Sequence, residues 1–90
     1  MANKTLTLTI SDKEFTFNLN AEDYNAAIDE IMPGNKIQPA HNFCMRCIAD
    51  KDKEALAKIL DGPSVAWQLW QVITEAYVPD LNIKVGKLSG

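Results

Sequence analysis

The feature that most constrains the fold is a change in the spacing of apolar residues at Asn20. Between residues 5 and 19, apolar and polar side chains alternate in two runs, which the polar stretch 11–14 separates. A period of two places the apolar side chains on one face of a strand, so the runs predict an antiparallel hairpin with one buried face. After Asn20 the period becomes about 3.6, which is typical of amphipathic helices. The sequence therefore predicts an α+β fold, in which an N-terminal antiparallel β-hairpin packs against about four short helices.

The first two predicted helices follow the hairpin directly. Asn20 suits the N-cap of a helix over 21–32, because its side-chain oxygen can accept a backbone N–H at the helix start. Pro39 suits the first turn of the second helix, where its missing N–H needs no partner. Something must cover the apolar face of the hairpin, because two strands alone are only marginally stable in water.

Two more helices are predicted in the second half of the chain. Asp50 or Asp52 caps the third, and the fourth covers about 64–77 with Trp70 in the core. The residues that follow are too few for another helix. They predict a short C-terminal strand or a tail.

Length and composition set the scale of the molecule. Ninety residues with 47% hydrophobic side chains and a formal charge of -3 describe one small globular unit. We expect a single domain over 1–90. It comprises the hairpin at 1–19, a helical part at 20–78 and a C-terminal extended segment or tail at 79–90.

Several classes of partner and location are excluded on composition. The nine basic residues are scattered, whereas nucleic-acid binding requires clustered positive charge. No window approaches the roughly 20 apolar residues that span a bilayer, and the first ten residues lack the apolar run of a signal peptide. Two cysteines are too few for a disulfide framework, which fits a reducing cytoplasm. We expect no nucleic acid and no membrane among the partners.

His41, Cys44 and Cys47 form the one constellation with the residue types of a metal or redox site. A structural zinc site needs four ligands, and the sequence offers no second pair. A reactive thiolate is favoured at a helix N-terminus, whereas Cys44 is expected more than one turn inside its helix. Burial as small apolar side chains fits both cysteines better. We therefore predict no catalytic residues, no metal and no other cofactor, and expect a protein that is not an enzyme.

What remains is recognition through the surface. Trp67 projects outside the apolar sector of the fourth helix, so it can anchor a partner, although core packing is the alternative. Methionines adapt to varied partners, and a cluster of acidic side chains can meet a basic partner or simply face water. A free strand edge can accept another chain, which includes a second copy in a homo-oligomer. The candidate partner-binding residues are Trp67, Met32, Met45, Glu22, Asp23, Asp29 and Glu30.

Three strings carry a family resemblance: TLTLTI at 5–10, NAEDYNAAIDEIMPGNKIQPAHNF at 20–43 and YVPDLNIKVG at 77–86. Together they resemble the tail assembly chaperones of long-tailed bacteriophages and prophages over nearly the whole chain. The resemblance implies a non-enzymatic protein in the cytoplasm of the bacterial host, which binds the phage tape-measure protein and helps the tail-tube protein assemble around it. It also implies absence from the mature virion. The alternative is a small phage or bacterial protein-binding module that inhibits or adapts a host factor.

Overall fold

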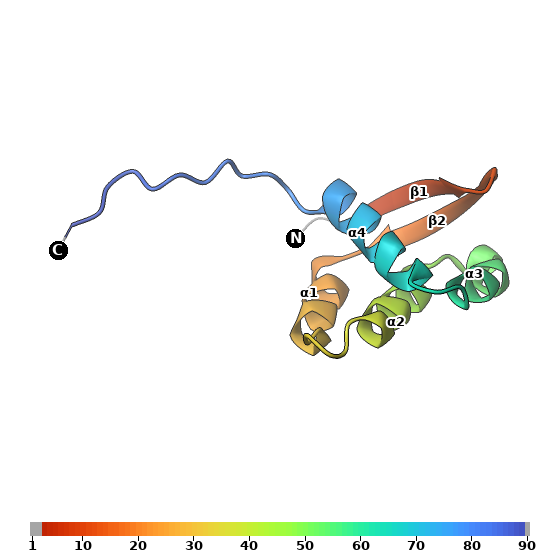
Figure 1. The fold of residues 1–90 in the computed structure, drawn as a ribbon. Coiled ribbons are helices and arrows are strands. Elements are labelled where there is room, and N and C mark those ends of the chain that lie inside the picture. The colour runs from red at the N-terminus through yellow and green to blue at the C-terminus, as the bar shows by residue number, and fades with distance from the viewer. Residues whose placement is uncertain (1–2, 90) are drawn as a thin grey trace.

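The computed structural model describes residues 3–89, and it confirms the α+β prediction of a hairpin followed by four helices (Figure 1). Two antiparallel strands lie on one side of the molecule, and the helices pack against one face of them. In chain order the elements are β1 (Lys4–Ile10), β2 (Lys13–Leu19), α1 (Ala21–Glu30), α2 (Ile37–Cys47), the short 3-10 helix η1 (Asp50–Asp52), α3 (Lys53–Leu60) and α4 (Val65–Tyr77).

The hairpin turns within two residues. Ser11 and Asp12 both have positive φ, 50° and 67°, as a type I′ turn requires, and Ile10 pairs directly with Lys13. The expected polar turn is therefore confirmed but is shorter than the polar stretch 11–14, since Lys13 and Glu14 already belong to β2. This register places Phe15 and its apolar neighbours on β2 toward the helices. The threonines of β1 face water.

The outer edge of β2 is closed by the segment that leads into α3. The Thr16 carbonyl accepts a hydrogen bond from the Ala49 N–H at 2.8 Å, and the Thr16 N–H donates to Asp52 Oδ2 at 2.9 Å. Asp52 does stand at the N-cap position of α3, as predicted, but its carboxylate makes no cap hydrogen bond to that helix. Its side chain joins the sheet instead. Only 5% of Asp52 is exposed.

The helix starts and ends follow local signals to within two residues. Asn20 caps α1 as predicted, because its Oδ1 accepts the Asp23 N–H at 2.8 Å. α1 ends at Glu30, two residues before the predicted end of the helix. α2 starts at Ile37, so Pro39 falls third in the helix, where a missing N–H still leaves no intrahelical bond unmade.

An aromatic cluster forms the centre of the core. Tyr24 stacks on Trp70 with ring centroids 4.8 Å apart, and Phe43 meets Trp70 edge-on at 5.1 Å. The Tyr24 hydroxyl donates to Thr74 Oγ1 at 3.2 Å, which satisfies its polar end. The core placement predicted for Trp70 is confirmed. These contacts join α1, α2 and α4 into one layer beneath the hairpin.

Residues 78–89 form no strand or helix and lead away from the rest of the chain (Figure 1). The sequence left a third strand or a tail open, and the structure shows a tail beside a two-stranded sheet. It accounts for a radius of gyration of 15.2 Å, against about 12 Å for a compact chain of this length. Within the described residues, no helix has the length and apolar character needed to cross a membrane.

Candidate functional site

Exposed apolar side chains gather around the connection between α1 and α2. Ile28, Met32 and Ile37 are 46%, 62% and 45% exposed. The connection itself is a tight turn, in which Met32 and Asn35 exchange two backbone hydrogen bonds of 3.1 and 2.9 Å. We call Ile28, Met32 and Ile37, with the turn that joins their helices, the connector surface. Because the turn is fixed by its own hydrogen bonds, this apolar surface is held in place without a partner.

Trp67 lies between the core and the connector surface. Its ring stacks on Trp70 with centroids 6.5 Å apart, and the Lys36 ammonium lies over the same ring, 5.0 Å from its centroid. Trp67 is therefore half-buried, and Lys36 is the neighbour that a partner would have to displace or share. A cation over an exposed tryptophan is worth about 0.5–1 kcal/mol, a small barrier to such displacement. The role of Trp67 as an anchor stays a prediction.

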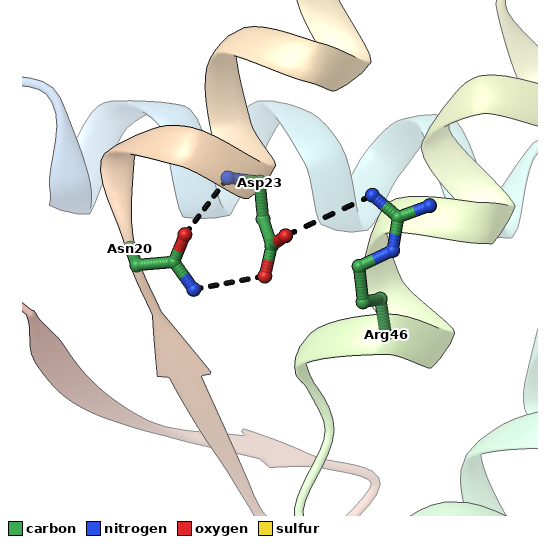
Figure 2. Close-up of polar contacts among 3 residues, drawn as sticks. All are labelled: Asn20, Asp23 and Arg46. Carbon is green, nitrogen blue, oxygen red and sulfur yellow. Dashed lines mark hydrogen bonds and ion pairs between the residues drawn. The ribbon is translucent and has the colours of Figure 1, made fainter.

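The acidic residues of α1 divide into two groups by position. Glu22 and Asp23 lie in the first turn, where carboxylates stabilise the helix dipole. Asp23 is partly buried and has two side-chain partners: its Oδ2 accepts from Asn20 Nδ2 at 2.8 Å, and its Oδ1 lies 3.8 Å from Arg46 Nη1 (Figure 2). This contact links α1 to α2. Asp23 therefore has a structural use, and Glu22 is exposed beside it.

Asp29 and Glu30 lie at the opposite end of α1 and are exposed. A helix C-terminus carries partial negative charge, and α1 has no basic residue in its last turn. The two carboxylates therefore destabilise the helix by about 0.3–1 kcal/mol each at low salt. They follow Ile28 directly in the sequence and precede Met32 closely, so the connector surface has an acidic border.

The predicted residues thus fall in three places. Asp29, Glu30 and Met32 are exposed at the end of α1 and in the turn that follows it, and Trp67 meets Lys36 of the same connection. Met45 packs partly against the core from α2, away from the turn. Sequence reasoning did not select Ile28, Lys36 or Ile37 as candidates. The exposure of Lys36 and Ile37 could have been inferred from their position at the short connection between two helices, because residues in connections are commonly exposed.

Cys44 and Cys47 are buried in α2. Burial raises the pKa of both thiols from 9.0 to about 12, with a further rise from Cys47 at Cys44 and from Asp23 at Cys47. Both thiols are therefore protonated at neutral pH, whereas metal binding and nucleophilic attack need the thiolate. Within residues 3–89, no three histidine, cysteine or acidic side chains are grouped to hold a metal ion.

Comparison with known proteins identifies a family. Residues 6–87 match the model of a family described as phage tail assembly chaperone. An uncharacterized 11.3 kDa protein from the lys 3′ region of Haemophilus phage HP1 is 31% identical over 80 residues, which cover 89% of this chain and 78% of that protein. No solved structure matches the chain. Because this match runs from within β1 to near the end of the tail, the chain belongs to the phage tail assembly chaperone family.

Proposed function

We propose that the protein acts in phage tail assembly by binding the tape-measure protein and assisting the tail-tube protein to assemble around it. It does so stoichiometrically, without catalysis, in the cytoplasm of the infected bacterium, and it leaves before the virion is complete. The observation that carries the proposal is the family match over residues 6–87. The protonated state of Cys44 and Cys47 supports a role without thiol chemistry.

The connector surface supports the choice of client. Its apolar centre, Ile28, Met32 and Ile37, is bordered by Asp29 and Glu30. An amphipathic helix buries its apolar face in such a surface, and basic residues beside that face would meet the two carboxylates. The carboxylates weaken α1 when the protein is alone, so a cationic partner would relieve that unfavourable interaction with the helix dipole. We therefore assign client binding to this surface.

Two variants on the connector surface test the assignment. Glu30→Lys should weaken client binding because it reverses a charge at the border of the site. It should also leave the free energy of unfolding unchanged or raise it by about 0.3–1 kcal/mol, since a cation suits a helix C-terminus. Met32→Asp should weaken binding by placing a charge in the exposed apolar centre. The measurement is co-purification of a co-expressed tape-measure protein, with stability followed by urea unfolding.

Glu22→Lys is the matched control, because it makes the same charge reversal at the other end of α1. It should lower stability through the helix dipole and leave binding nearly intact. Equal loss of binding in Glu22→Lys and Glu30→Lys would remove the assignment to the connector surface. If wild-type protein fails to solubilise the tape-measure protein and instead captures a host protein, the adaptor or inhibitor role replaces the chaperone role.

A further inference from the structure

β1 has an unpaired edge. In a hairpin with a two-residue turn, Ile10 and Lys13 form the first hydrogen-bonded pair, and bonded and non-bonded pairs then alternate. The backbone N–H and C=O groups of Thr5, Thr7 and Thr9 therefore point away from β2. On β2 the corresponding groups of Thr16 are bonded to Ala49 and Asp52. Among the described residues, nothing hydrogen-bonds to the outward backbone groups of β1.

An apolar groove lies beside this edge. A pocket of about 310 Å³ lies between the turn end of β1 and the start of α4, with a contribution from α3. Ile10, Val65 and Leu69 line it, and so does Val72, which is half-exposed. A third strand beside β1 would place every second side chain over α4 at this groove, because side chains alternate between the faces of a sheet. The edge thus offers backbone hydrogen bonds and a place for apolar side chains.

The tail has the matching pattern. Leu81, Ile83 and Val85 alternate with polar residues, and Ile83 and Val85 are each 83% exposed. One departure from extended backbone interrupts the alternation: Asn82 has φ 50°, and its N–H donates to Asp80 Oδ1 at 3.0 Å. Asparagine adopts both this and the extended conformation at low cost, so the segment can straighten on pairing.

The geometry favours a second copy over the same chain. The tail leaves α4 at Val78, which lines one pocket together with Lys4, the first residue of β1. A tail folded back on its own β1 would therefore run parallel to it, whereas Figure 1 shows it running away from the hairpin. A second copy can offer the same segment antiparallel, as in the hairpin itself. The tail carries Lys84 and Lys87 against Asp80, and the whole chain has a formal charge of -3, so tail and body attract.

We propose that the tail of one copy adds as an antiparallel third strand to β1 of a second copy, with Ile83 and Val85 over the groove at Val72. When each copy donates its tail to the other, the contact is two-fold symmetric and covers the β1 edge of each copy. The proposal is independent of client binding, because the connector surface takes no part in it. It concerns a different part of the molecule, the exposed apolar tail and the open edge of β1, which cover each other in the pair.

The test combines a tail variant and an edge variant in full-length protein. Ile83→Asp/Val85→Asp should weaken self-association at least tenfold, and Asn82→Asp/Gly86→Asp, which adds the same charges on the other face of the strand, should weaken it less. Thr7→Pro should also weaken it, because it removes an outward N–H that the hairpin does not use. Sedimentation equilibrium measures association, and urea unfolding checks that each variant folds. A mixture of the tail variant and the edge variant should associate, since one intact tail and one intact edge remain.

Hydrogen exchange distinguishes the same chain from a second copy. The amides of Thr5, Thr7 and Thr9 should become protected as protein concentration rises, and the tail variant should lose that protection. A wild-type protein that stays monomeric up to millimolar concentration overturns the proposal. So does protection of these amides in the monomer, which would mean that the tail pairs within its own chain.

Discussion

At the scale of single residues, Asp52 shows how one side chain can hold two elements together. Among the described residues, Asp52 is the one buried charged side chain. Its carboxylate accepts a hydrogen bond from the outward N–H of Thr16 on β2. The 36 positions that separate the two residues make this contact invisible to any local pattern. An aspartate directly before a helix predicts an N-cap, since capping is the common role of aspartate at that position.

Asp52→Ala should lower the free energy of unfolding by about 1–3 kcal/mol, because it leaves the partly buried Thr16 N–H without its acceptor. Asp52→Asn should cost less, since the amide oxygen can still accept. Asp50→Ala is the control: its side chain is fully exposed. Urea unfolding measures all three. Equal effects at positions 50 and 52 would mean that the carboxylate matters only for the start of α3.

Trp67 and Trp70 illustrate the limit of periodicity at the same scale. The helical pattern predicts Trp70 in the core, and the structure agrees. The same pattern predicts Trp67 outside the apolar sector. In the structure, however, its ring is half-buried, because it stacks on Trp70 and lies under Lys36. Lys36 comes from another element, so its effect on Trp67 depends on tertiary packing. Truncating Trp67 therefore changes stability as well as any binding role.

At the scale of elements, α1 has opposite electrostatics at its two ends. Its start is well stabilised: Asn20 exchanges hydrogen bonds with Asp23, and acidic residues occupy the first turn. Its end carries acidic residues where helices favour basic ones. The N-cap was predictable because the cap, its partner and the helix are adjacent in the sequence. The exposure of Ile28 was not, because it depends on how α1 packs against α2 and α4.

Asn20→Ala should lower the free energy of unfolding by about 1 kcal/mol, since it removes the acceptor for the Asp23 N–H. Asn20→Asp should cost much less, because aspartate caps helices equally well. Thermal or urea unfolding provides the measurement, with circular dichroism as the probe. Asn25→Ala, at an exposed position inside the same helix, should be neutral or slightly stabilising. A loss at Asn25 as large as at Asn20 would argue against capping.

At the scale of the whole molecule, the order and type of elements followed from the sequence because each period is a local property. The alternation over residues 5–19 became the hairpin, and the longer period became the helices. The tail shows where such reasoning stops. Its alternating residues fit a strand, but a strand needs an edge beside it, and the edge of β1 lies away from the direction in which the tail leaves α4.

The pH dependence of unfolding is also a property of the whole molecule. The pKa of Cys44 and of Cys47 is raised from 9.0 to about 12 in the folded state. Above pH 9 the unfolded chain loses thiol protons that the folded chain keeps, so this stabilisation is complete below pH 9 and is lost as pH rises toward 12. Cys44→Ala/Cys47→Ala should be less stable at neutral pH and should lose less stability between about pH 9 and pH 11.

Urea unfolding at several pH values measures this difference in slope. Parallel curves for the variant and the wild type would mean that the thiols do not govern the alkaline limb.

The closure of β2 by Ala49 and Asp52 has a consequence for sheet growth. A hairpin with two open edges has a valence of two, so hydrogen-bonded strands can stack through it without limit, as they do in amyloid fibrils. Here the middle of one edge is occupied by the chain itself, because both outward backbone groups of Thr16 are already bonded. The hairpin can therefore extend its sheet on the β1 side only, so it cannot serve as a link in the middle of a continuous cross-β stack.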